Sequence, residues 1–253
     1  MSNTPTLVLL PGLLCDAAVW AAGTEALAGV RCIVPSYGLA DSLPAMAQAV
    51  LAALPAGLAG PQGRFGHCGS FDRFSLAGHS MGGRVALELM RLAPERVERF
   101  ALLDSGLDPL PESEAGERER DGRLALLALA RREGMRAMAL QWARGMVHPD
   151  HVTQPVFEQV VAMVCRSTPE VFERQIHALL ARPDARSVFA NVHCPTLLAC
   201  GRQDAWSPLA RHEQMQRLLP HATLTVIEDS GHMAPMEQPA AVAAALRTWM
   251  ACS

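Results

Sequence analysis

The feature of this sequence that most limits its fold is a regular alternation of short apolar runs with longer amphipathic segments. Six apolar runs have the length of β-strands: residues 6–10, 31–35, 73–78, 99–104, 196–201 and 223–228. Apolar residues continue through these runs with little alternation, which is typical of strands buried on both faces of a parallel sheet. Helix-like segments occur at 41–54, 81–93, 208–219 and 239–250. The pattern predicts an α/β fold with a doubly wound, mostly parallel sheet.

The alternation stops after Asp104 and resumes only near Pro195. The stretch between them has helical patterns and no run that resembles a strand. It opens with the charged segment PESEAGERERDGR and continues with a segment rich in Leu, Ala and Met that also carries arginines. Such a piece is expected to pack over another part of the fold. We therefore predict an α/β core made of residues 1–106 and 188–253, with residues 107–187 forming an inserted helical cap.

The composition and the missing motifs exclude several function classes. Half of the 253 residues are hydrophobic, 19% are charged and the net charge is -3, so neither disorder nor nucleic-acid binding is expected. No Walker A or G-x-G-x-x-G pattern occurs, and the glycine-rich stretch at 60–70 is predicted to be a loop, so no cofactor is expected. The pairs His67-Cys68 and His193-Cys194 lack a second pair at ligand spacing, so no metal site is predicted.

The cysteines and the length of the apolar runs indicate in which cellular compartment the protein is expected. The seven cysteines are an odd number without C-x-x-C spacing, as expected where thiols stay reduced. The opening MSNTPTLVLLPGLLC has no basic region and is broken by Pro11, so it is interpreted as a first strand rather than a signal. No uncharged apolar run reaches the roughly 18 residues of a membrane span. We expect a cytoplasmic protein that acts on a small molecule and has no membrane partner.

The stretch LAGHSMGGR, residues 76–84, puts Ser80 between Gly78 and Gly82, after an apolar run and before a helical one. In that setting G-x-S-x-G predicts a nucleophile elbow, a sharp strand-to-helix turn with positive φ at its centre and no room for side chains at the second neighbours. Such a turn holds the hydroxyl at the carboxyl end of the sheet, where ligands of open parallel sheets bind. The G-x-S-x-G pattern alone is common in sequences, so the prediction rests on its position after an apolar run and before a helical one.

A serine hydroxyl is a weak nucleophile at neutral pH and needs a base within hydrogen-bonding distance, with a third group that fixes the tautomer of the base. Of the nine histidines, His232 is the best placed, in a loop between the last strand-like run and the final helix. Asp204 follows the preceding strand-like run in the same way. The chain order Ser80, Asp204, His232 is the one expected for this elbow, so these three residues are the predicted catalytic set.

With these motifs the chain resembles the α/β-hydrolase-fold serine hydrolases, from residue 6 to the C-terminal helix apart from the insertion. The resemblance implies an oxyanion hole made of two backbone N–H groups, one after the first strand and one directly after the nucleophile. In this sequence these residues are Leu13 and Met81. Such enzymes usually have a His-Gly pair after the first strand, whereas this chain has Pro11 before Gly12, a difference that bears on the shape of that loop.

Other polar residues near these positions have plainer interpretations. Asp104 also ends a strand-like run and is an alternative acid, although a capping or loop role is favoured. His79 is interpreted as a packed neighbour of the elbow. Glu237 and Asp229 are interpreted as residues that hold the turn of His232 in place.

Aromatic, methionine and arginine residues of the insertion are interpreted mainly as packing and as a solvated face. The alternative is that Trp142 and Met146, together with Trp206 two residues after Asp204, line the substrate pocket. A further alternative is that an arginine of the insertion binds a substrate carboxylate. The arginines considered are Arg131, Arg132, Arg136 and Arg144.

Function has to be inferred from the site, because this fold hosts many reactions. Within the family that the chain resembles, a serine nucleophile disfavours dehalogenases and epoxide hydrolases, and a single tyrosine cannot supply the pair that the latter use. The absence of lysine disfavours hydroxynitrile lyases. We predict a hydrolase of carboxylic esters with small or medium, largely apolar groups. Carbon–carbon bond hydrolysis, or a lyase reaction like that of the menaquinone pathway, is the alternative, and a non-catalytic ligand receptor is a third.

Overall fold

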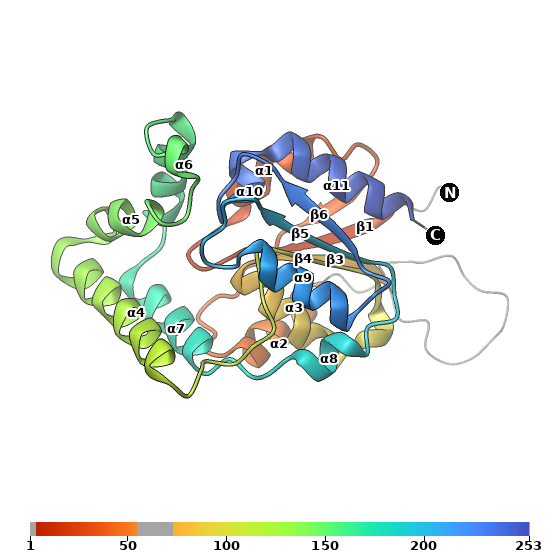
Figure 1. Ribbon diagram of the computed structural model, residues 1–253, viewed down its shortest axis with the longest axis horizontal. Helices are drawn as coiled ribbons and strands as arrows, with labels where there is room; N and C mark the ends of the chain where they lie inside the picture. The colour runs from red at the N-terminus through yellow and green to blue at the C-terminus, as the bar shows by residue number, and fades with distance from the viewer. Residues whose placement is uncertain (1–3, 55–72, 253) are drawn as a thin grey trace, which may run out of the picture.

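The computed structural model describes residues 4–54 and 73–252, and its centre is a six-stranded sheet (Figure 1). The strands are β1 (Thr6–Leu10), β2 (Arg31–Ile33), β3 (Phe74–His79), β4 (Val97–Leu103), β5 (Thr196–Gly201) and β6 (Thr223–Ile227). Their order is β2-β1-β3-β4-β5-β6, and every neighbouring pair is parallel. The chain therefore starts inside the sheet, runs to one edge and then winds to the other, which confirms the predicted doubly wound α/β fold.

Burial differs between the central and the edge strands. β1, β3 and β5 are buried along their whole length, which is why their sequences show no polar alternation. β2 and β6 form the two edges and are partly exposed. β2 ends at Ile33, short of the predicted end at residue 35, and β4 begins at Val97, before the predicted start at residue 99.

Helices cover both faces of the sheet (Figure 1). One face carries α1 (Ala21–Glu25), α10 (Ala234–Glu237) and α11 (Pro239–Ala251). The other carries α2 (Leu43–Ala53), α3 (Met81–Leu92), α8 (Arg186–Ala190) and α9 (Leu209–Leu218). The four helical segments expected from the sequence correspond to α2, α3, α9 and α11. Two of the four start at known signals: the Ser42 side chain accepts a hydrogen bond from the Ala45 N–H at the start of α2, and Pro239 opens α11.

Between β4 and β5 the structure describes every residue and contains helices but no strand. These helices are α4 (Glu114–Glu133), α5 (Met135–Ala143), α6 (Pro155–Val164) and α7 (Pro169–Leu180), followed by α8. α4 to α7 lie together on the left of Figure 1, beyond the end of the sheet at which Ser80 follows β3. α8 instead contacts α3 of the core, and residue 187 lies inside it. The division into a core of 1–106 and 188–253 and a cap of 107–187 stays a proposal.

Two predictions from the sequence remain, one on the glycine-rich loop and one on membrane spans. The loop predicted at 60–70, with the pair His67-Cys68, lies outside the described residues. Within residues 4–54 and 73–252, none of the helices combines the length and the apolar character that spanning a bilayer requires.

Candidate active site

Ser80 occupies the turn between β3 and α3, with φ 53° and ψ -118°. A Cβ at Gly78 would collide with the carbonyl oxygen of Gly82, and a Cβ at Gly82 would collide with the carbonyl oxygen of Leu10. The Ser80 N–H donates to Leu103 O of the neighbouring strand at 2.9 Å, which holds the turn against the sheet. The two glycines are therefore required by close packing around a strained serine, as the sequence pattern predicts.

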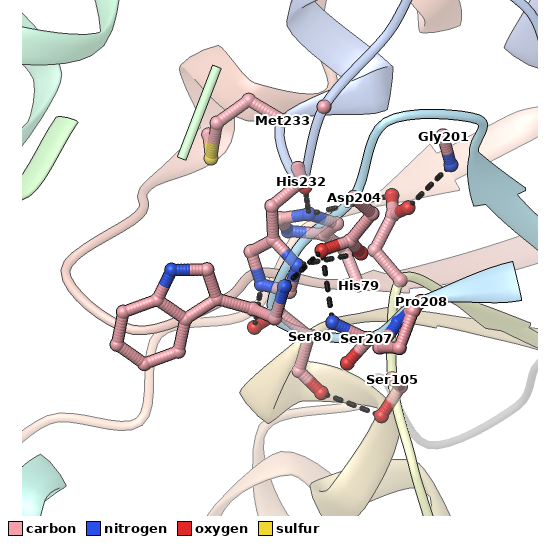
Figure 2. A network of polar contacts seen from close by, with 12 residues as sticks. His79, Ser80, Ser105, Gly201, Asp204, Ser207, Pro208, His232 and Met233 are labelled. Carbon is pink, nitrogen blue, oxygen red and sulfur yellow. Dashed lines mark hydrogen bonds and ion pairs between the residues drawn. The ribbon is translucent and has the colours of Figure 1, made fainter. Parts of the chain in front are cut away.

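The side chains of Ser80, His232 and Asp204 form one hydrogen-bonded chain (Figure 2). His232 Nε2 lies 2.7 Å from Ser80 Oγ, and His232 Nδ1 lies 2.8 Å from Asp204 Oδ2. Because the carboxylate can only accept at Nδ1, the neutral imidazole carries its proton there and presents the Nε2 lone pair to the serine hydroxyl. The three residues come from the loops after β3, β5 and β6, which all open at the same end of the parallel sheet.

Asp204 is buried and is held as an anion. Its second oxygen, Oδ1, accepts hydrogen bonds from the N–H groups of Trp206 and Ser207, both at 2.8 Å. Burial alone would raise the pKa of Asp204, but the charge and hydrogen bond of His232, together with these two N–H donors, lower it to about 2. A carboxylate that stays ionised in this way can orient the His232 ring and stabilise its protonated form.

Asp104, the alternative acid, lies in the same region but does not contact the His232 ring. It directly follows β4, is fully buried, and accepts a hydrogen bond from the Gly201 N–H at 2.8 Å. Among the described residues, its other oxygen has no hydrogen-bond partner. Burial, followed by the nearby charge of Asp204, raises the pKa of Asp104 well above its usual value, which favours the protonated form of this carboxyl. The geometry therefore places Asp204, and not Asp104, on His232.

The backbone of His232 is fixed from two sides. His79 Nε2 lies 2.7 Å from His232 O, and because a carbonyl only accepts, this ring nitrogen carries the proton. Burial, followed by the charge of His232, lowers the pKa of His79 to about 3, so its ring stays neutral. The His232 N–H donates to Met146 O at 2.7 Å, which links the turn to the segment after α5.

Glu237, at the end of α10, accepts hydrogen bonds that hold the turn of His232 in place. Its side chain is fully buried. One carboxylate oxygen accepts from the N–H groups of Gly231 (2.9 Å) and Met233 (3.2 Å), the two neighbours of His232. The other accepts from the His148 N–H (2.6 Å) and contacts His151 Nδ1 (2.8 Å). One carboxylate thus fixes both the His232 turn and the segment that covers it.

Replacing Glu237 by glutamine is expected to lower the free energy of unfolding by about 2–4 kcal/mol, because an amide NH₂ would face two buried N–H donors. Urea denaturation followed by circular dichroism measures this change. Glu228→Gln is the matched control: Glu228 is exposed at the start of the loop that carries His232, where it pairs with Arg202, and its replacement is expected to change stability by less than about 0.5 kcal/mol. Equal stability of the two variants would contradict the role given to Glu237.

Leu13 and Met81 both line the cavity beside Ser80. Met81 begins α3, and the first N–H groups of a helix have no acceptor within that helix. Leu13 lies in the loop after β1, where the next N–H, that of Leu14, donates to Gln175 Oε1 of α7 at 2.8 Å. Both residues thus lie at the cavity that Ser80 lines, and their assignment to an oxyanion hole is taken up below.

A cavity of about 450 Å³ is lined by Ser80 and His232, within the size range of small-molecule sites. The predicted pocket residues Trp142, Met146 and Trp206 all line it. Trp142 and Met146 are buried, whereas Trp206 is 40% exposed.

The arginines that line the cavity are not the ones considered from the sequence. Arg131, Arg132 and Arg136 pair at exposed positions with Glu173, Glu133 and Glu158, and Arg144 lies over the Phe157 ring. The cavity is instead lined by Arg84, Arg123, Arg182 and Arg211. The position of Arg84 could have drawn attention, because it lies four residues after Ser80 in the first turn of the same helix. The others are brought to the site only by the tertiary fold.

One group beside the His232 turn has donor atoms that a metal ion could share. His148, His151 and Asp229 each offer one such atom, all within 4.8 Å of one another. His148 Nδ1 already accepts the Asp150 N–H at 3.1 Å, and His151 Nε2 lies 3.4 Å from the Asp229 carboxylate. These contacts account for the grouping without an ion, and the absence of a metal requirement stays a prediction.

Comparisons with known proteins agree with this architecture. The chain is 25% identical over 257 residues to a pimeloyl-[acyl-carrier protein] methyl ester esterase of Nitrosomonas europaea, covering 91% of this chain and 89% of the relative. It is 28% identical over 187 residues to a 2-succinyl-6-hydroxy-2,4-cyclohexadiene-1-carboxylate synthase of Klebsiella pneumoniae, covering 70% and 68%. The solved structure of a thermophilic esterase from Thermogutta terrifontis aligns with a TM-score of 0.80 and 26% identity, covering 97% and 89%.

A family model covers most of the chain. Residues 7–245 match the model described as the alpha/beta hydrolase family. The matched region includes Ser80, Asp204 and His232, the three residues of the hydrogen-bonded chain. This protein therefore belongs to the alpha/beta hydrolase family.

Proposed function

We propose that this protein is a serine hydrolase of carboxylic esters with small or medium, largely apolar groups. The observation that carries the proposal is the hydrogen-bonded chain from Ser80 Oγ through His232 to Asp204, beside a cavity of about 450 Å³. The similarity to a pimeloyl-[acyl-carrier protein] methyl ester esterase supports an ester as substrate. A cytoplasmic location is part of the proposal and is supported by the described cysteines, all of which are unpaired.

In the proposed reaction, Ser80 Oγ attacks the ester carbonyl carbon while His232 Nε2 takes the hydroxyl proton. The tetrahedral oxyanion accepts hydrogen bonds from the N–H groups of Leu13 and Met81, and each preorganised donor lowers the barrier by about 3 kcal/mol. The carbon–oxygen bond to the alcohol then breaks as His232 returns the proton to the leaving oxygen. Water repeats the sequence on the acyl-enzyme, with His232 again as base, and releases the acid. Asp204 orients the ring throughout.

The helices of residues 107–187 are proposed to act as a cap that excludes water and selects the substrate. Two contacts support this assignment. Met146 O, in the insertion, accepts the His232 N–H, and the Arg123 guanidinium of α4 lies 5.7 Å from the ring centroid of Trp206 in the Asp204 loop. The insertion is thus joined to both loops that carry the proposed acid and base.

A lyase or a carbon–carbon hydrolase is the second candidate. It is favoured by the similarity to the cyclohexadiene-carboxylate synthase and by the arginines that line the cavity. The intact Ser-His-Asp hydrogen-bonded chain beside a cavity argues against a non-catalytic receptor, because ligand binding alone does not require it.

A substrate panel separates the two enzyme candidates. p-Nitrophenyl esters of increasing acyl length are compared with a vinylogous diketone, a substrate of carbon–carbon hydrolases. We expect release of p-nitrophenol from the short and medium esters, lost in Ser80→Ala, and no cleavage of the diketone. A higher kcat/KM for the diketone than for every ester would overturn the proposal.

A further inference from the structure

We propose that the cavity at Ser80 binds an ester that carries a second, anionic group, such as the free carboxylate of a dicarboxylic acid monoester, and that Arg84 and Arg211 hold this group. The inference rests on the proposed function, since it names the substrate class of the same site. Both arginines line the cavity together with Ser80 and His232. Arg84 lies in the first turn of α3 and Arg211 in the first turn of α9, so both are anchored on core helices.

Both guanidinium groups lie beside Gly106. Gly106, in the loop after β4, has no side chain, and a Cβ there would lie 3.4 Å from Arg84 Nη2 and 3.4 Å from Arg211 Nη1. Arg84 Nη1 donates to Asp108 O at 2.9 Å, and Arg211 Nη1 donates to Trp206 O at 3.0 Å. These bonds fix the planar groups but use only part of the five N–H donors of each. A pair of preoriented guanidinium groups matches the geometry of a carboxylate.

The other two arginines of the cavity have a carboxylate partner. Glu119 of α4 pairs with both of them, because its carboxylate bonds Arg123 at 2.9 Å and Arg182 at 2.7 Å. Within residues 4–54 and 73–252, no carboxylate forms an ion pair with Arg84 or Arg211, although four arginines share one cavity. Guanidinium groups gathered in this way attract an anion from solution.

Among the residues that the structure describes, the remaining acids at the cavity form no ion pair with Arg84 or Arg211. Asp108 is exposed and offers Arg84 its backbone oxygen, and the raised pKa of Asp104 favours its uncharged form. The charges of Glu119 and Asp108 raise the pKa of Arg84, but by less than its burial and its arginine neighbours lower it. Burial, followed by the positive charges of Arg182 and Arg211, lowers the pKa of Arg84 to about 9. A bound carboxylate would offset this repulsion, which gives the site a preference for anions over neutral groups of the same shape.

The rest of the lining suits the uncharged part of such a molecule. Leu13, Met81, Trp142 and Met146 contribute apolar surface around Ser80. A short methylene chain packed there would connect the ester at Ser80 with the carboxylate at Arg84 and Arg211. An ester with an apolar chain and a charged end thus fits both parts of the cavity.

Pairs of methyl esters test the inference. Monomethyl esters of the dicarboxylic acids from succinate to suberate are each compared with the ω-carboxamide methyl ester of the same length, which is neutral and has almost the same shape. We expect the ratio of kcat/KM, carboxylate over carboxamide, to be about tenfold or more at the best length, and to fall about tenfold in Arg84→Gln and in Arg211→Gln. Arg132→Gln, which removes an exposed arginine of α4 paired with Glu133, is expected to keep the ratio.

The outcomes distinguish this inference from the proposed function. Turnover of both esters with a ratio near one, or a ratio that both cavity variants leave unchanged, overturns the inference and leaves ester hydrolysis standing. If neither ester is hydrolysed, the proposed function is wrong, and calorimetry of monomethyl adipate binding to Ser80→Ala then decides the inference. Binding that is at least about tenfold weaker when Arg84→Gln is added supports the anion site, whereas no binding or equal binding overturns it.

Discussion

Replacing Ser80 by alanine is expected to lower kcat for ester hydrolysis by roughly 10⁴-fold or more, because His232 then has no hydroxyl from which to take a proton and no acyl-enzyme can form. The fold should persist, since alanine has the same Cβ at this positive φ and the Gly78 and Gly82 spacing is untouched. Steady-state kinetics on the best ester of the panel measures the loss. Circular dichroism and urea denaturation are expected to show stability within about 1 kcal/mol of the parent protein.

Ser187→Ala serves as the matched control for this substitution. Ser187 is exposed on α8, so the same chemical change there should leave kcat and stability unaltered. A Ser80→Ala protein that is folded and retains more than about a tenth of the parent kcat would mean that another group performs the attack.

Replacing Asp204 by asparagine is expected to lower kcat by roughly 10³- to 10⁴-fold, because the amide can donate to His232 Nδ1 and hold the ring in the wrong tautomer. The matched comparison is Asp104→Asn, which should change kcat by no more than about threefold, since Asp104 does not touch His232 and an amide resembles the protonated carboxyl that burial favours there. Kinetics of both variants on one ester measures the difference. A loss in Asp104→Asn equal to that in Asp204→Asn would reassign the acid.

The same pair should also differ in how pH affects stability. The pKa of Asp204 is lowered to about 2 in the fold, so its contribution is present above the unfolded value of 3.8 and is lost as the pH falls toward 2. The pKa of Asp104 is raised in the fold, so the folded state keeps a proton that the unfolded chain releases, and stability declines as the pH rises above 3.8. Asp104→Asn is therefore expected to be more stable than the parent at pH 7, and to lose that advantage near pH 3.

The fold and the proposed catalytic set could be read from the sequence because they depend on local patterns. Uninterrupted apolar runs identify the buried strands. The glycines on either side of Ser80 indicate a turn without room for side chains, and in the structure a Cβ at Gly78 or Gly82 would collide with the backbone. His232 and Asp204 follow strands, and the carboxyl ends of parallel strands meet at one edge. The chain order favours Asp204 over Asp104 as the acid, but both follow neighbouring strands, and only the side-chain geometry shows which one touches His232.

Features that depend on how distant parts of the chain meet in the fold could not be predicted from local sequence patterns. Arg84, Arg123, Arg182 and Arg211 come from four separate parts of the chain, and no spacing in the sequence brings their guanidinium groups to one cavity. Of the four arginines of the insertion considered from the sequence, three are instead paired with glutamates at exposed positions, and Arg144 lies over the Phe157 ring. A charged side chain on a helix has the same local signature whether it faces solvent or a pocket.

The central claim is that Ser80 Oγ is the atom that becomes acylated, and covalent labelling tests it most directly. The protein is incubated with a fluorophosphonate probe, and the adduct is counted by intact mass spectrometry and located by peptide mapping. We predict one adduct per chain, on Ser80, and none in Ser80→Ala or in protein unfolded before the probe is added. An adduct on another residue, or folded protein that takes up no probe while its ester hydrolysis continues, would contradict the account.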